Sequence, residues 1–126
     1  RSAFEGALGD LCISRDIGVV TYYSLASGFL TGKYRQQSDL AQSQRGGGIG
    51  KYLNPRGLRI VDTLVEVAEQ NDAKPAEVAL AWLMSREGVT APIASATSIA
   101  QVESFARAAA LTLSADQLAR LDSASA

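Results

Sequence analysis

Apolar positions recur along this chain with two spacings, one typical of helices and one typical of strands. Residues 3–15 carry apolar side chains in an i, i+3, i+4, i+7 pattern, which predicts an amphipathic helix. Residues 18–23 read Gly-Val-Val-Thr-Tyr-Tyr, a short β-branched and aromatic run that predicts a buried strand. Residues 91–95 read Ala-Pro-Ile-Ala-Ser and predict a second short strand.

Two further helices are predicted between the strands. Apolar spacing predicts one over 56–70, and a run that is apolar on nearly every side predicts another over 76–85, buried on several sides. Pro75 suits the first position of this second helix, and Glu77 falls in its first turn. The polar segment 35–50 before them predicts a long loop.

Two helices are predicted after the second strand, each opened by a reciprocal capping pair. Ser98 with Gln101 begins the first, and Ser114 with Gln117 begins the second. The first of these helices has one apolar face that we expect to be packed. Its members are Val102, Phe105, Ala106 and Ala109.

The order of these elements predicts an α/β fold. Strands that alternate with helices pair in parallel through right-handed crossovers. Two strands make a marginal sheet, and a parallel sheet needs both faces covered. We therefore expect residues 1–126 to be one unit, without an internal boundary, of a larger parallel sheet. The simplest such sheet is a (β/α)8 barrel, of which this chain is an incomplete part.

Composition narrows the function without naming it. The chain has 126 residues, 47% of them apolar, and thirteen acidic against twelve basic side chains. Such a balance argues against a nucleic-acid or anionic-membrane surface, and no apolar run is long enough to span a membrane. The single cysteine, Cys12, is expected to be a small core residue of a cytoplasmic protein in a reducing compartment.

Histidine is absent from the sequence, which removes the commonest general acid–base and the commonest metal ligand. We accordingly assign no metal ligand to this chain. The chain also begins at Arg1 without an initiator methionine, so a fragment or a trimmed chain is expected.

The end of the second predicted strand is a candidate anion site. Ser95-Ala96-Thr97-Ser98 leads directly into a capped helix, where exposed N–H groups and the helix dipole favour an anion. The alternative is a helix cap with no ligand, because capping pairs occur in many helices.

The end of the first predicted strand offers a second candidate. Tyr22 can stack on a planar ring, Ser24, Ser27 and Gly28 can approach a pyrophosphate, and Lys33 can pair with it. The alternatives are a packed tyrosine, an ordinary loop and a solvated lysine. A glycine-rich loop around residues 46–48 would close over the ligand, with Arg45 or Lys51 as phosphate partner.

Taken together, the two candidates lie at the C-terminal ends of strands, where barrels and open α/β sheets bind ligands. Neither a Walker A sequence nor a GxGxxG turn follows a strand, so a P-loop or Rossmann site is not supported. A phosphate-binding barrel of unrelated chemistry also fits these anion sites.

Residues 18–34 closely resemble the seventh-strand segment of aldo-keto reductases, and residues 79–83 and 89–98 resemble the last helix–strand unit of that family. The resemblance implies a (β/α)8 barrel whose strands 7 and 8, with their helices, lie in this chain. It also implies an oxidoreductase that uses NADP(H), and less favourably NAD(H), to reduce aldehydes or ketones to alcohols.

The same resemblance implies site residues. Tyr22 matches the aromatic residue that stacks on the nicotinamide. A second group matches the turn that contacts the pyrophosphate: Ser24, Leu25, Ser27, Gly28, Leu30 and Lys33. A third group matches the region around the adenosine phosphate: Ser95, Thr97 and Gln101. Gln101 stands where several members carry an arginine, and Ser104-Phe105 stands where a Glu-Asn pair often holds the adenine.

Catalytic residues of the family lie on earlier strands, so the resemblance assigns no catalytic residue to this chain and implies that the 126-residue chain alone is inactive. Its expected partners are a small carbonyl substrate and either the missing N-terminal half of the barrel or a second copy. The alternative function is a non-catalytic subunit of the same fold that binds a nicotinamide nucleotide or has a structural role.

Overall fold

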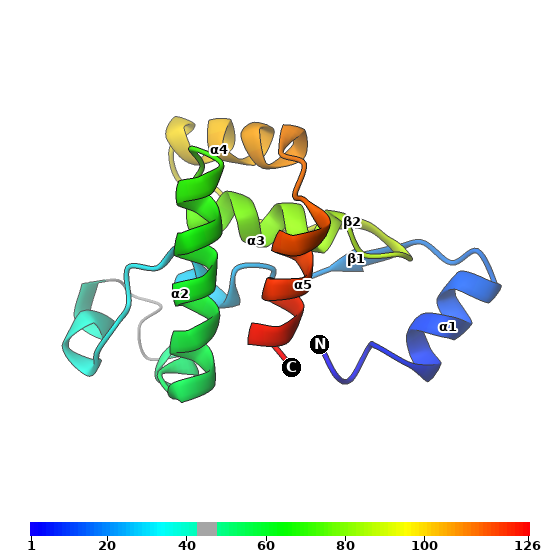
Figure 1. The fold of residues 1–126 in the computed structure, drawn as a ribbon, viewed down its shortest axis with the longest axis horizontal. Coiled ribbons are helices and arrows are strands. Elements are labelled where there is room, and N and C mark those ends of the chain that lie inside the picture. The colour runs from blue at the N-terminus through cyan, green and yellow to red at the C-terminus, as the bar shows by residue number, and fades with distance from the viewer. Residues whose placement is uncertain (43–47) are drawn as a thin grey trace.

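A computed structural model describes residues 1–42 and 48–126. The chain is α/β, with a short sheet beside a larger group of helices (Figure 1). In chain order the elements are α1 (Ala7–Ser14), β1 (Val19–Thr21), the 3-10 helices η1 (Ala26–Thr31), η2 (Gln37–Gln42) and η4 (Gly50–Tyr52), then α2 (Pro55–Gln70), α3 (Pro75–Met84), β2 (Val89–Pro92), α4 (Ile99–Ala110) and α5 (Ala115–Ala124).

Strands β1 and β2 pair in parallel, as predicted, with Val19 opposite Val89 and Thr21 opposite Pro92. Within the described ranges the sheet has these two strands and is not closed. Both strands differ in their bounds from the prediction: β1 ends two residues early, and β2 begins two residues early and ends three residues early, before Ser95. Tyr23 has a φ of 55°, which turns the chain out of the extended conformation and ends the pairing at the Ile93 N–H to Thr21 carbonyl bond.

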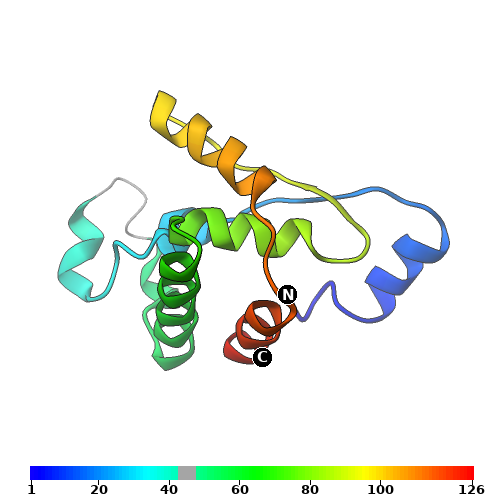
Figure 2. The same ribbon diagram turned by 45° about the horizontal axis from the view of Figure 1, so that its top comes forward.

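Helices α2, α3 and α5 enclose the main hydrophobic core (Figures 1 and 2). Their shared buried residues come from all three helices and from the segment before α5. They are Leu64, Val67, Ala68, Val78, Ala79, Ala81, Leu113 and Leu121. The prediction that α3 is buried on several sides is confirmed. Trp82 of α3 donates from Nε1 to Asp122 of α5 at 2.9 Å, and Arg86 also pairs with that carboxylate.

A second, smaller core joins the 3-10 segments to α2. Phe29, Tyr34, Ile49 and Val61 are buried there, and the Phe29 ring stacks on Tyr52 with centroids 5.5 Å apart. Gly57 of α2 has no room for a Cβ, because the Tyr52 carbonyl group occupies that space. Part of the segment predicted as a loop is structured, because it contains η2 and Ile49, which is buried in the smaller core. Arg45, Gly46 and Gly47 lie outside the described residues.

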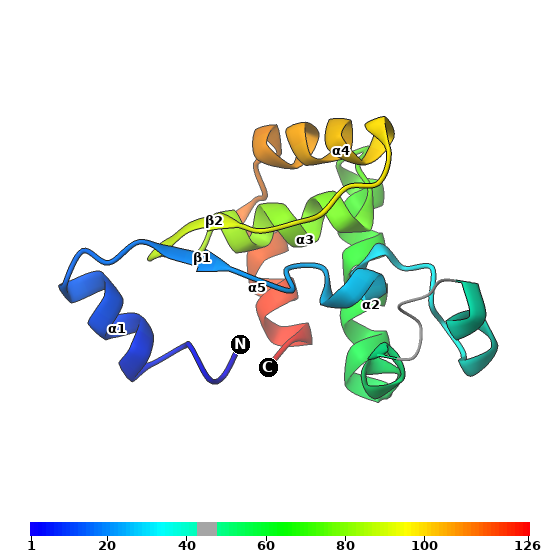
Figure 3. The same ribbon diagram turned by 180° about the vertical axis from the view of Figure 1, so that it is seen from behind.

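Helix α1 lies to one side of this body (Figures 1 and 3). It begins at Ala7, later than predicted, because residues 1–5 form turns whose bonds end on the Arg1 and Phe4 carbonyl groups. The apolar face expected to be packed is open: Leu8 is 52% exposed and Leu11 is also exposed, while Cys12 is half-buried. Cys12 is therefore not a core residue here.

The sheet is likewise covered on one side. Helix α3 packs against β2, but Val20 and Ile93 are each 54% exposed. The prediction that β1 is a buried strand is therefore wrong for this chain on its own, because its residues are half-buried or exposed and the helix that packs on the sheet, α3, contacts β2.

Helix α4 packs on α3 through a different face from the one predicted. Ser104 and Ala108 are its buried residues, whereas Val102, Ala106 and Ala109 are exposed and Phe105 is half-buried. The reason is polar: Ser104 donates a hydrogen bond to the buried Glu77 of α3, and the small Ala108 lets the two helices approach. Figure 2 shows α4 crossing above α3.

Candidate functional site

Both predicted ligand segments leave the sheet at the same edge. Because β1 and β2 are parallel, residues 22–33 and residues 93–101 start from the C-terminal ends of neighbouring strands. Figure 3 shows the two segments running from the sheet toward the same end of the molecule. This edge is where α/β proteins with parallel strands place their ligands.

Tyr22 and Tyr23 begin the first segment with two open aromatic rings. Tyr22 is 75% exposed, and its ring meets that of Tyr23 edge-on, with centroids 5.2 Å apart. An edge-on contact leaves ring faces available, so either ring could stack on a planar ligand group.

The turn after these tyrosines is built from unusual backbone conformations. Ala26, Ser27 and Gly28 all have positive φ angles, so three successive residues lie in the left-handed region. Ser24 is buried and donates to the Thr21 carbonyl group at 3.0 Å, which ties the turn to the end of β1. The Ser24 hydroxyl therefore holds the turn, whereas Ser27 is only half-buried.

Leucines of this segment anchor it to the protein interior. Leu25 packs on the main core and Leu30 packs on both cores, while the neighbouring Phe29 is buried. Thr31 donates to the Gly28 carbonyl group at 2.7 Å and closes η1. The side chains of Leu25 and Leu30 thus act in packing, and any contact they make with a ligand would come from their backbone.

Lys33 is the cation of this segment. It is exposed, and its Nζ lies 4.9 Å from the centroid of the Tyr34 ring. Lys51 makes the matching contact with Tyr52, also at 4.9 Å. Both ammonium groups therefore rest on aromatic rings at the border of the smaller core and remain open to solvent on their other sides.

The second segment is held by caps and not by packing. Ser95, Thr97 and Gln101 are all exposed. Gln101 accepts the Thr97 N–H on its Oε1 at 2.6 Å, and the Ser98 hydroxyl accepts the Gln101 N–H at 3.4 Å. The predicted reciprocal pair is therefore half right: Gln101 reaches back to Thr97 and not to Ser98. The Ser114–Gln117 pair of α5 is reciprocal as predicted.

Sequence reasoning missed a buried polar cluster behind this segment, formed by Glu77, Ser104 and Arg107. Glu77 is 2% exposed, and its Oε1 accepts from Ser104 at 2.6 Å and from Arg107 at 2.9 Å. Its Oε2 accepts the Lys74 N–H at 3.0 Å. Burial alone would raise the pKa of Glu77, but the hydrogen bonds from Ser104, Lys74 and Arg107 outweigh it and lower the pKa.

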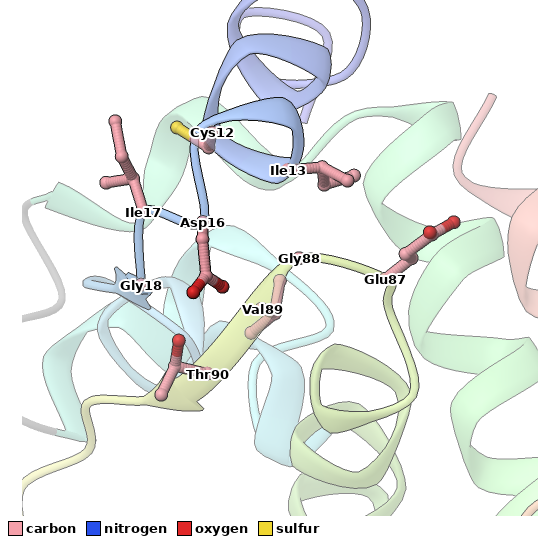
Figure 4. Close-up of a pocket in the computed structure, with 9 residues that line it drawn as sticks. All are labelled: Cys12, Ile13, Asp16, Ile17, Gly18, Glu87, Gly88, Val89 and Thr90. Carbon is pink, nitrogen blue, oxygen red and sulfur yellow. The ribbon is translucent and has the colours of Figure 1, made fainter.

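A hollow outside the two candidate segments lies at the other end of the strands. Figure 4 shows it between the end of α1 and the start of β2, with Cys12, Asp16 and Glu87 on its rim. It measures about 260 Å³ and is open to solvent. Over residues 1–42 and 48–126 no three potential metal ligands come together, and no helix there has the length and hydropathy to cross a membrane.

A protein family and several known proteins are similar to this chain. The model of the aldo/keto reductase family matches residues 1–126. An uncharacterised oxidoreductase of Mycobacterium tuberculosis is 43% identical over 105 residues, which cover 77% of this chain and 30% of that protein. The L-glyceraldehyde 3-phosphate reductase of Escherichia coli O157:H7 is 30% identical over 125 residues, covering 94% of this chain and 36% of that protein.

A third relative is a Schizosaccharomyces pombe aldo-keto reductase whose name carries NADP(+), 28% identical over 85 residues that cover 65% of this chain and 25% of that protein. The chain thus spans about a third of the length of the curated relatives it matches. The family match over every residue, with the parallel strand pair that the structure shows, establishes the relationship: this chain belongs to the aldo/keto reductase family.

Proposed function

We propose that this chain is the C-terminal part, strands 7 and 8 with their helices, of an aldo/keto reductase barrel. We also propose that the whole protein reduces a small aldehyde or ketone to an alcohol with NADP(H), and with NAD(H) as the weaker alternative. The observation that carries the proposal is the convergence of two segments, 22–33 and 93–101, at the C-terminal edge of one parallel strand pair.

The residues at this edge fit a nicotinamide dinucleotide. The open Tyr22 ring offers a flat apolar face for the nicotinamide. The left-handed turn at Ser27 and Gly28 brings backbone close to the surface, and the exposed Lys33 follows it as a partner for the pyrophosphate. The exposed hydroxyls of Ser95 and Thr97, with Gln101, lie at the start of α4, where the helix dipole favours a phosphate.

When bound, the nicotinamide ring supplies the hydride for carbonyl reduction. The role of this chain is to bind and orient: Tyr22 fixes the plane of the ring, the turn at Ser27 and Gly28 holds the pyrophosphate, and the start of α4 holds the adenosine end. No acid–base group is assigned to this chain, because the catalytic residues of the family lie on strands that precede those described here. The proton donor belongs to the remainder of the protein.

Fluorescence titration of the full-length protein with NADPH tests this proposal, using Tyr22→Ala beside its neighbour Tyr23→Ala as the matched control. Loss of one stacking contact should raise the Kd of Tyr22→Ala about 3- to 10-fold. The Kd of Tyr23→Ala should change less. Equal effects of the two substitutions would contradict the role given to Tyr22.

A steady-state assay of the same protein with a panel of aldehydes and NADPH separates the two candidate functions. Turnover supports the reductase. Tight NADPH binding without turnover would support the non-catalytic subunit, and absence of NADPH binding would overturn the proposal.

A further inference from the structure

Helix α4 packs on the rest of the chain with little buried apolar surface. Its neighbour in the fold is chiefly α3. Only Ser104 and Ala108 among its residues are buried, and Ile99 at its first turn is 79% exposed. A 12-residue helix with so little apolar burial needs another fixed point to keep one orientation.

The carboxylate of Glu77 provides that fixed point. It binds Ser104 and Arg107, which lie one turn apart on α4, and the Lys74 N–H at the start of α3. Two bonds to successive turns of the same helix restrict both its rotation and its tilt. Because Glu77 is buried, water competes poorly for these bonds.

The same helix carries the proposed adenosine end of the cofactor site. Gln101 lies one turn before Ser104, so about 5 Å of helix separates the anchor from the cap. Gln101 in turn holds the Thr97 N–H, so a shift of α4 moves the whole segment from Thr97 to Gln101.

We propose that Glu77 is a positioning residue for the adenosine-phosphate end of the cofactor, acting through Ser104, Arg107 and the first turns of α4. The proposal rests on the function proposed above and deepens it. It concerns one end only, since the turn at residues 24–30 is held independently by Leu25, Phe29 and Leu30 on the two cores.

Calorimetry of the full-length protein with two half-ligands tests the inference. The probes are 2′,5′-ADP for the adenosine end and nicotinamide mononucleotide for the other end. Coupling through a packed helix should raise the Kd of Glu77→Gln for 2′,5′-ADP between about 2-fold and about 30-fold. The Kd for nicotinamide mononucleotide should stay unchanged, which a general loosening of the protein would not allow.

Three further variants complete the design. Glu69→Gln on α2 removes the same charge from an exposed site and should leave both affinities unchanged. Arg107→Gln, whose side chain is half exposed, perturbs only the α4 side of the cluster and decides the matter if Glu77→Gln does not fold. Arg107→Lys, which keeps the positive charge, should recover part of the lost affinity.

The outcomes separate the two proposals. If the wild-type protein binds both probes and the cluster variants alter both affinities equally, or neither, the positioning role is overturned while the cofactor site stands. A wild-type protein that binds neither probe nor NADPH overturns both.

Discussion

Two segments at the same edge of the sheet are held in place by different interactions, one by apolar packing and the other by hydrogen bonds. Residues 22–33 are set into the protein by apolar side chains, with Phe29 1% exposed and Leu25 and Leu30 packed on the cores. Residues 95–101 have no such anchors and depend on helix caps and on α4. A ligand that contacts both segments would therefore bind at one end to a segment fixed by apolar packing and at the other end to a segment fixed by hydrogen bonds.

Because the two segments are held by different interactions, they should respond to different changes. Close-packed side chains respond to changes of volume and hardly to pH or salt. Hydrogen bonds to a buried carboxylate respond to protonation and to the loss of a single partner. Substitutions matched across the two segments can therefore test whether the contrast is real.

The largest effect is expected from Phe29→Ala in the packed segment. Deleting a buried aromatic ring that stacks on Tyr52 should lower the free energy of unfolding of the full-length protein by about 3–5 kcal/mol. Ile99→Ala, which truncates an exposed side chain on α4, should change it by less than about 0.5 kcal/mol. Urea denaturation measures both changes. Similar midpoints for the two variants would contradict the claim that apolar packing holds residues 22–33 but not the start of α4.

An intermediate effect is expected at the Glu77 cluster, and it should depend on pH. The pKa of Glu77 is lowered from its ordinary 4.5 in the folded protein, so the unfolded chain takes up a proton first as pH falls. The stability that Glu77 contributes is therefore complete above about pH 4.5 and is lost as pH falls through the lower folded pKa.

Arg107→Ala removes part of this contribution. It should lower the free energy of unfolding by about 1–2 kcal/mol at pH 7. This value is near the lower end of the range for a hydrogen bond to a charged group, because Arg107 is half exposed. The gap between the wild-type and variant urea midpoints should narrow as the pH is lowered from 5 to 3. A gap that stays constant over this range would show that Glu77 is not the group that titrates.

The smallest effect is expected at the cap of α4. Ser98→Ala removes the acceptor for the Gln101 N–H and should cost about 1 kcal/mol. Ser114→Ala is the matched control, because it removes the same kind of cap from another helix, α5, where Ser114 and Gln117 form a reciprocal pair. Hydrogen exchange of the first turn of each helix should show Ser98→Ala fraying α4 alone, and unchanged exchange in α4 would argue against the cap as its main support.

Local signals predicted much of this fold. The spacing of apolar residues and Pro75 located α2 and α3 to within about a residue at most of their ends, and the alternation of elements predicted the parallel pair. These features depend on neighbours in the chain, which a sequence displays directly. The placement of the two candidate segments at one edge followed from the same pattern.

Other features depended on contacts that local patterns do not reveal. The face of α4 is set by Glu77, which is 27 residues from Ser104 in the sequence, so the apolar pattern of Val102, Ala106 and Ala109 pointed to the wrong side. The end of β1 is set by a positive φ at Tyr23, a conformation that a tyrosine seldom adopts. The apolar face of α1 kept its predicted pattern, but Leu8 and Leu11 on it are exposed.

The bond from the Thr97 N–H to Gln101 has a consequence for redesign of this protein. One amide oxygen both closes the loop and occupies the place from which a side chain could reach a phosphate. An arginine at this position would bring positive charge but would have no acceptor for that N–H, so stronger anion recognition and a closed loop compete for one residue. A substitution at this position that is meant to strengthen anion binding should therefore need a second substitution that supplies a new acceptor for the loop.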